Sequence, residues 1–151
     1  VAGGTPTFPV HALNPEVTLS PGTCLLWDYG YSAKFCDLNF RHAAVLLSRV
    51  ISKPGKGLLC LDLGHKAVAA EMPHPRVYFP ELPGVKFHSQ SEEHLVIEVS
   101  EAENYQVGDV VYGIPTHICP TTALYQELVV VKSGMVIDHW EVYARKRKIT
   151  L

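Results

Sequence analysis

The chain has 151 residues, of which 47% are hydrophobic, enough to bury the core of about one domain. Its formal net charge of −2 gives no electrostatic reason to bind nucleic acid or an anionic membrane, and no apolar run approaches the roughly 20 residues that cross a bilayer. The four cysteines form neither a CxxC pair nor a dense disulfide spacing, so a cytoplasmic protein with no nucleic-acid or membrane partner is predicted.

The first residues, Val1-Ala-Gly-Gly-Thr-Pro-Thr7, contain no initiator Met, no basic region and no apolar signal segment. We therefore expect a segment that begins partway through a longer polypeptide. The turn Gly3-Gly-Thr5 lies between an apolar strand end and a short helix expected over residues 8–13. Such a turn can present backbone N–H groups and hydroxyls to a phosphate. The alternative is a plain tight turn that uses two glycines.

Two stretches of the first half are interpreted as strands. Residues 24–29 follow a Pro-Gly-Thr turn and predict a buried strand, on which Trp27, Tyr29 and Tyr31 would share one face. Residues 41–52 are long enough for a helix. Their β-branched tail and the Pro-Gly-containing turn before the next apolar run instead favour a hairpin of two strands.

The second half continues the alternation of short apolar runs and turns. Residues 72–84 contain four prolines, a density that predicts a fixed surface loop without a central helix or strand. Further strands are expected over residues 93–99 and after a turn within 105–112. The clearest hairpin signal is Ser133-Gly134 between two apolar runs. From about residue 17 onward, the pattern predicts one mainly β unit.

The run Gly113-Ile-Pro-Thr-His-Ile-Cys-Pro-Thr121 places an imidazole and a thiol two residues apart, between prolines that stiffen the backbone. In an extended segment residues i and i+2 point to the same face, so His117 and Cys119 could reach one ion. Histidine nitrogen and cysteine thiolate are common zinc ligands. The alternative is a core cysteine beside a histidine bonded to a neighbouring carbonyl, because His-x-Cys often arises by chance.

Three other groups carry weaker signals. In Ser91-Glu-Glu-His94 the carboxylates could orient the ring or act as acid or base, but a charged strand entrance explains them as well. The basic run Arg145-Lys-Arg-Lys148 fits a polyanion partner or the protection of an edge strand. Lys66 could form a Schiff base, although no burial cue indicates the lowered pKa which that role requires.

Taken in order, these motifs resemble the C-terminal half of the D-serine dehydratase and D-threonine aldolase family. That family comprises metal-activated pyridoxal phosphate (PLP) enzymes with an alanine-racemase-like architecture. The resemblance spans essentially the whole chain. It rests on these segments: Gly3-Gly-Thr-Pro-Thr7, Pro21-Gly-Thr23, Asp62-Leu-Gly-His-Lys66, Ser91-Glu-Glu-His94, Pro115-Thr-His-Ile-Cys-Pro-Thr121 and Leu124-Tyr125. The most specific of them is His-x-Cys-Pro-Thr.

The resemblance implies that residues 17–151 form a C-terminal, mainly β, metal-binding domain and that residues 1–16 end a (β/α) barrel that holds PLP. By this similarity, the site residues are Gly3, Gly4 and Thr5 for the cofactor phosphate, and His117 and Cys119 for zinc or another divalent metal. The Schiff-base lysine of the family lies in N-terminal sequence that this chain lacks. No catalytic residue is assigned here, and the isolated chain is expected to be inactive.

The implied function is that of a lyase acting on a D-β-hydroxy amino acid, by D-serine dehydration or by D-threonine aldol cleavage. PLP stabilises a carbanion at the α-carbon, and zinc assists chemistry at the β-oxygen as a Lewis acid. Some aldolases of the family carry Asp where Cys119 stands, which favours the dehydratase branch. A homodimer is expected at full length. The alternatives are a non-catalytic all-β binding module and an amino-acid racemase of the same architecture.

Overall fold

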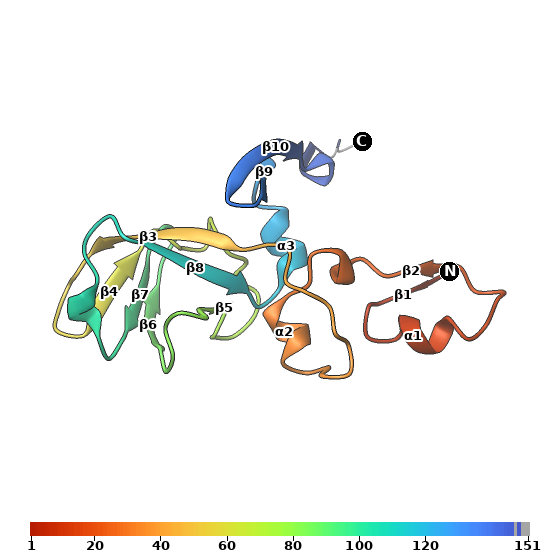
Figure 1. The fold of residues 1–151 in the computed structure, drawn as a ribbon, viewed down its shortest axis with the longest axis horizontal. Helices are drawn as coiled ribbons and strands as arrows, with labels where there is room; N and C mark the ends of the chain where they lie inside the picture. Colours follow the sequence, from red (N-terminus) through yellow and green to blue (C-terminus); the bar gives the residue numbers. More distant parts are fainter. Residues whose placement is uncertain (147, 149–151) are drawn as a thin grey trace.

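The computed structural model of the protein describes residues 1–146 and 148. The chain contains a six-stranded sheet. Figure 1 shows an elongated chain with this sheet at one end and the short N-terminal elements at the other. A small helix, α3, and a separate hairpin lie between them. No helix in the described part of the chain is long and apolar enough to cross a membrane.

The large sheet is antiparallel, with strand order β5-β8-β3-β4-β7-β6. Its strands are β3 Leu46–Ser52, β4 Leu58–Leu61, β5 Val77–Tyr78, β6 Lys86–Gln90, β7 Leu95–Glu98 and β8 Val110–Pro115. The register shifts within the β3–β4 and β6–β7 pairs, between Val50 and Ser52 and between Phe87 and Ser89. The expected hairpin of β3 and β4 and the strands β7 and β8 are confirmed.

One face of this sheet forms the core. Along β3, Leu46, Ser48 and Val50 are buried while the residues between them are exposed, which is the alternation of a half-buried strand. The cluster consists of Leu46, Val50, Leu59, Leu61, Leu63, Val68, Val77, Phe79, Leu82, Leu95, Ile97, Val99, Ala102 and Val111. Ala102 comes from the 3-10 helix η2 Ala102–Asn104. Each large side chain buried in this way contributes about 1.5–3 kcal/mol.

The proline-rich stretch over residues 72–84 differs from the predicted surface loop. It contains β5, and three of its side chains, Val77, Phe79 and Leu82, are buried in the core. The physical reason is that β5 is only two residues long and lies at the edge of the sheet, where neighbouring prolines cost no ladder hydrogen bond.

The N-terminal elements form a small unit of their own. Strand β1 Ala2–Gly3 pairs in parallel with β2 Leu19–Ser20, and the helix α1 Phe8–His11 lies between them in sequence. The helix expected over residues 8–13 is therefore present but shorter. The β1–β2 pairing crosses the expected boundary between residues 16 and 17, and the division into barrel end and β domain remains a prediction.

The strand predicted over residues 24–29 is wrong. The chain forms the 3-10 helix η1 Thr23–Leu25 and then the short helix α2 Tyr29–Ser32, joined at Trp27 with a positive φ of 53°. The indole of Trp27 is buried against Tyr31 and Phe40, with ring centroids 5.9 and 5.1 Å away. Tyr29 stacks instead on Tyr78 of β5, at 4.4 Å. Trp27 and Tyr31 thus pack against each other, whereas Tyr29 packs against the large sheet.

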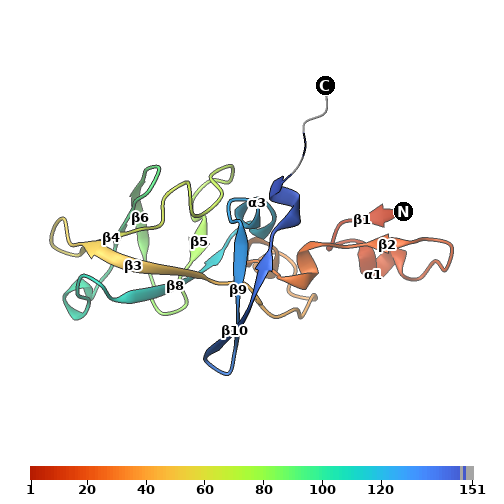
Figure 2. The ribbon, with the colours of Figure 1, turned by 90° about the horizontal axis from the view of Figure 1, so that it is seen from above.

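The predicted C-terminal hairpin is confirmed as β9 Glu127–Lys132 and β10 Met135–Glu141. Ser133 and Gly134 both have positive φ, as a tight two-residue turn requires. Figure 2 shows the hairpin projecting away from the large sheet, and every residue of β10 is exposed. A 3-10 helix, η3 Tyr143–Lys146, follows; within the basic run Lys146 pairs with Glu141, and Arg147 lies outside the described residues.

Candidate metal and cofactor site

His117 and Cys119 do not lie in one extended segment, so the geometric basis of their prediction is wrong. Strand β8 ends at Pro115, His117 is the extended N-cap residue with φ −136° and ψ 103°, and Cys119 lies in the first turn of helix α3 Ile118–Thr122. The rule that residues i and i+2 share a face therefore does not apply here. The assignment of the two residues as metal ligands remains a prediction.

The helix starts after His117 because a buried carboxylate caps it from a distant segment. Asp28 is only 2% exposed, and its Oδ2 accepts a hydrogen bond from the Ile118 N–H at 3.1 Å. Its Oδ1 accepts from the Tyr31 N–H at 2.9 Å, which caps α2. One side chain thus fixes the beginnings of both helices. An Asp before a short apolar run is a recognised cap signal, so the α2 cap was accessible from sequence, whereas the contact with α3 was not.

The backbone just before His117 is held from two further sides. The carbonyl of Thr116 accepts from Gly30 N–H at 3.1 Å, and the Thr116 N–H donates to the Arg76 carbonyl at 2.8 Å. The Thr116 hydroxyl also donates to Pro75. A Cβ added at Gly30 would lie 2.3 Å from the Thr116 oxygen, so only glycine permits this approach.

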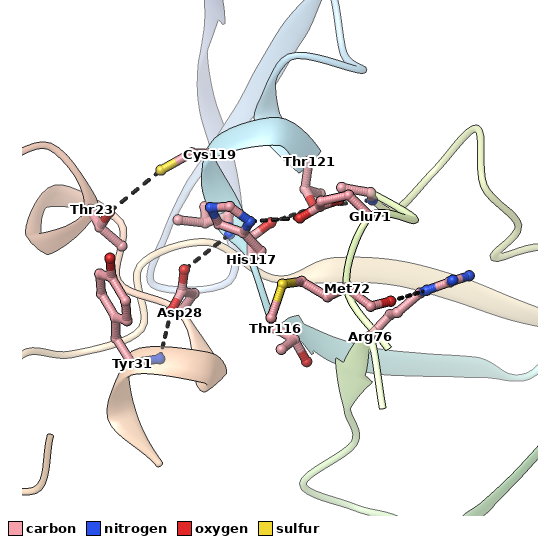
Figure 3. Close-up of polar contacts among 12 residues, drawn as sticks. Thr23, Asp28, Tyr31, Glu71, Met72, Arg76, Thr116, His117, Cys119 and Thr121 are labelled. Atoms are coloured by element: carbon pink, nitrogen blue, oxygen red, sulfur yellow. Dashed lines mark hydrogen bonds and ion pairs between the residues drawn. The ribbon is translucent and has the colours of Figure 1, made fainter. Parts of the chain in front are cut away.

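The imidazole of His117 is oriented by Glu71. His117 Nδ1 lies 2.6 Å from Glu71 Oε1, and both side chains are about half exposed. A carboxylate can only accept, so Nδ1 carries the hydrogen in this contact, and in the neutral form of the ring the lone pair then lies on Nε2. In Figure 3 the ring lies between Glu71 and Cys119, with Nε2 on the side of the view where Cys119 lies.

The thiol of Cys119 is exposed, and its Sγ lies 3.4 Å from Thr23 Oγ1. It takes part in no disulfide. Nitrogen and sulfur donors from the same helix start are a ligand pair that suits zinc. No cluster of three or more potential ligands from His, Cys, Asp and Glu occurs among residues 1–146 and 148. A metal held here would therefore take its remaining ligands from water, substrate or other polypeptide.

The predicted phosphate turn is well defined. Gly4 has φ +90°, a conformation that favours glycine. Thr5 is 2% exposed, and its Oγ1 accepts from the Cys24 N–H at 3.2 Å, which ties the turn to η1. The Thr5 hydroxyl hydrogen remains able to donate. Gly3 is linked through its carbonyl to the Thr7 hydroxyl.

The structure also brings two of the weaker candidates together. Lys66 Nζ lies 3.0 Å from Glu93 Oε1 and 3.3 Å from Glu92 Oε2, beside an open hollow of about 410 Å³ that His94 also lines. The hydrogen bonds that Lys66 donates, first to Glu93 and then to Glu92, raise the pKa of Lys66, which is opposite to what a Schiff-base lysine needs. Lys66 is thus a surface ion-pair partner.

Comparison with known proteins identifies the class. The family model described as the putative serine dehydratase domain matches residues 43–131. The chain is 34% identical over 147 residues to the D-threonine aldolase of Arthrobacter sp., which covers 95% of this chain and 38% of that enzyme. This chain therefore belongs to the D-serine dehydratase-like family, and it spans less than half the length of that relative.

Solved structures agree on the fold. The D-threonine aldolase from Filomicrobium marinum superposes with a TM-score of 0.75 at 25% identity, covering 84% of this chain and 36% of that one. The D-threo-3-hydroxyaspartate dehydratase from Delftia sp. HT23 gives 0.71 at 19% identity, covering 92% and 42%. The mainly β fold is thus that of about a third of an alanine-racemase-like enzyme, as expected.

Proposed function

We propose that this chain is the metal-binding C-terminal part of a PLP- and zinc-dependent lyase that acts on D-β-hydroxy amino acids. The observation that carries the proposal is that His117, whose Nδ1 contacts Glu71, and the exposed thiol of Cys119 both lie at the start of α3. Family membership and the chemistry of related enzymes support it.

The names of the relatives point to one substrate class. D-threonine and D-threo-3-hydroxyaspartate are both D-amino acids with a hydroxyl on the β-carbon, although one relative is an aldolase and another a dehydratase. A solved structure of a cysteine-to-alanine variant of a D-threo-3-hydroxyaspartate dehydratase shows it in its metal-free form, so that enzyme also has a form with metal. D-serine and D-threonine are accordingly the substrates to test first, and aldol cleavage and dehydration are the two reactions to distinguish.

His117 and Cys119 would hold the metal, and Gly3, Gly4 and Thr5 would contact the phosphate of PLP. When bound, zinc supplies Lewis-acid assistance at the β-oxygen and PLP stabilises negative charge at the α-carbon. The contribution of this chain is to hold an imidazole nitrogen and a thiolate at the start of a helix whose backbone is fixed by Asp28 and Thr116. Four free thiols are compatible with a reducing cytoplasm, where we place the protein.

Metal analysis of the purified full-length protein, with and without His117→Ala, tests the proposal. Stoichiometric zinc in the wild type that is lost in the variant is expected. Equal metal content in both would contradict the proposal and favour a non-catalytic binding module.

Product analysis then distinguishes the reactions. Pyruvate and ammonia from D-serine indicate dehydration, glycine and acetaldehyde from D-threonine indicate aldol cleavage, and an L-amino acid indicates racemisation. We expect no turnover by residues 1–151 alone, because the family resemblance implies that the Schiff-base lysine lies in polypeptide outside this chain.

We further propose that the full-length protein forms a homodimer. The β9–β10 hairpin exposes Val129, Val131, Val136, Ile137 and Trp140. A two-stranded hairpin is marginally stable in water, so this apolar surface favours a covering partner. Sedimentation of the full-length protein should give a dimer, and Val136→Lys with Trp140→Lys should give monomer. A wild-type monomer would refute the dimer.

A further inference from the structure

We propose that Glu71 is a positioning residue for the metal site: its carboxylate fixes the His117 ring so that Nε2 is the nitrogen presented to the metal. This inference rests on the proposed function. It concerns a residue that the sequence analysis did not single out, 46 positions from His117 in the chain.

The first step is the chemistry of the pair. Because the Glu71 carboxylate has no hydrogen to donate, the 2.6 Å contact requires the Nδ1–H form of the ring. This leaves Nε2 with a lone pair and adds negative charge behind the imidazole. Histidines that bind metals commonly donate the other ring N–H to a carboxylate, which sets the tautomer and raises the basicity of the ligand.

The second step is the support of Glu71 itself. Two residues before it, the Ala69 N–H donates to Thr121 Oγ1 of α3 at 3.2 Å. One residue after it, the Met72 carbonyl accepts from Arg76 Nε at 2.7 Å. The segment of residues 69–76 is therefore attached to the metal-binding segment at both ends, because Arg76 also accepts from Thr116. Figure 3 shows the contact of Met72 with Arg76 next to the pair of Glu71 and His117.

The contact between Glu71 and His117 should affect metal binding far more than folding stability. The side chains of His117 and Glu71 are 42% and 44% exposed, and such exposed pairs add little to folding. By contrast, removing a carboxylate behind a metal-binding histidine typically weakens metal binding by about 10- to 100-fold. A change in metal affinity without a change in unfolding midpoint is thus the expected signature.

The chain contains a matched control. His139 Nδ1 lies 3.2 Å from Glu127 Oε1 in the β9–β10 hairpin, with side chains 52% and 58% exposed. This pair has the same chemistry and a similar exposure but lies on a different element from α3. Glu127→Ala therefore removes an equivalent carboxylate without touching the proposed site.

The experiment compares the wild-type full-length protein with Glu71→Ala, Glu71→Gln, Glu127→Ala and His117→Ala. Zinc affinity is measured by competition with a chromophoric chelator. The tautomer of the His117 ring is measured in the metal-free protein by side-chain ¹⁵N NMR. We expect about 10- to 100-fold weaker zinc binding for Glu71→Ala. Glu71→Gln, whose amide oxygen still accepts, should lose less, and Glu127→Ala should change affinity less than twofold. The Nδ1–H signal of His117 should diminish only when Glu71 is replaced by Ala.

The outcomes separate the two proposals. If His117→Ala abolishes zinc binding while Glu71→Ala keeps affinity within twofold and leaves the tautomer unchanged, the role of Glu71 is refuted and the proposed metal site stands. If His117→Ala leaves zinc binding unchanged, the proposed metal site fails, and the role of Glu71 toward a metal fails with it. Equal losses in Glu71→Ala and Glu127→Ala would also overturn the assignment.

Discussion

Replacement of Asp28 by Ala is expected to be among the most destabilising single changes outside the core. The side chain is 2% exposed, and its two oxygens accept from Tyr31 N–H and Ile118 N–H at 2.9 and 3.1 Å. Hydrogen bonds to a charged group contribute about 1.5–3 kcal/mol each, and a lost helix cap costs about 0.5–2 kcal/mol. Because these contributions overlap, we expect a loss of about 3–4 kcal/mol.

Such a loss is large against a total stability of about 5–15 kcal/mol, and for a chain of this size it corresponds to a fall in Tm of roughly 10 °C. Urea unfolding followed by tryptophan fluorescence measures it, because Trp27 is buried next to the substituted position. Asp28→Asn should lose about half as much, since one amide oxygen still accepts while the NH2 group faces the other N–H.

Asp37→Ala is the matched control, since Asp37 is an exposed aspartate nearby in the sequence. We expect it to change the free energy of unfolding by less than about 0.5 kcal/mol. If Asp28→Ala loses no more than Asp37→Ala, the carboxylate does not hold the two helix starts. The structural basis for the position of His117 would then be refuted.

Three further predictions concern single contacts. Gly30→Ala places a Cβ 2.3 Å from the Thr116 oxygen, so it should lower the free energy of unfolding by about 1–3 kcal/mol, measured by urea unfolding. Gly22→Ala is the control, because a Cβ there meets nothing within 4 Å and should leave stability unchanged. Equal effects of the two substitutions would contradict the close approach at Gly30. Burial, and to a smaller extent the charge of Asp62, raise the pKa of Tyr125 above its ordinary value of 10.0. The contribution of Tyr125 to folding stability is therefore fully present below pH 10 and is lost as the pH rises through the folded-state pKa. Tyr125→Phe should reduce the loss of unfolding free energy at alkaline pH. An unchanged dependence of stability on pH in this variant would refute the role of Tyr125. Glu93 and Glu92 raise the pKa of Lys66, so NMR titration should place it above 10.5, and a lower value would restore Lys66 as a nucleophile candidate.

Four strands of the large sheet, β3, β4, β7 and β8, were predicted from sequence because each is a local pattern, whereas β5 and β6 were not predicted. The Pro-Gly-containing turn separates β3 from β4, and the alternation in β3 follows from one buried face. The register irregularities and the strand order are set by long-range pairing, which no local window contains. The strand predicted over residues 24–29 was wrong for the same reason. Their apolar run resembles a strand, but the cap at Asp28 and the left-handed turn at Trp27 make it a helix start.

The candidate site likewise has features that a local sequence pattern predicts and features that depend on long-range contacts. His117 and Cys119 form a local motif, so they could be chosen as candidates from sequence. Their backbone conformation could not be predicted, because Asp28 caps the helix from 90 positions away. Glu71 was missed because no short pattern joins residue 71 to residue 117. Glu92, Glu93 and Lys66 were noted separately, and their meeting depends on how the loops after β4 and β6 fold together.

The position of the proposed metal-binding pair is thus set by residues that are not themselves proposed as metal ligands. Asp28 fixes the backbone at Ile118, Thr116 anchors the residue before His117 to two neighbouring segments, and Glu71 sets the orientation of the ring. The backbone around His117 is held by buried or backbone hydrogen bonds. The His117 ring is oriented by the half-exposed contact with Glu71, whose loss should change folding stability little. Substitutions at Asp28 should therefore lower stability and zinc affinity together, whereas substitutions at Glu71 should lower zinc affinity alone.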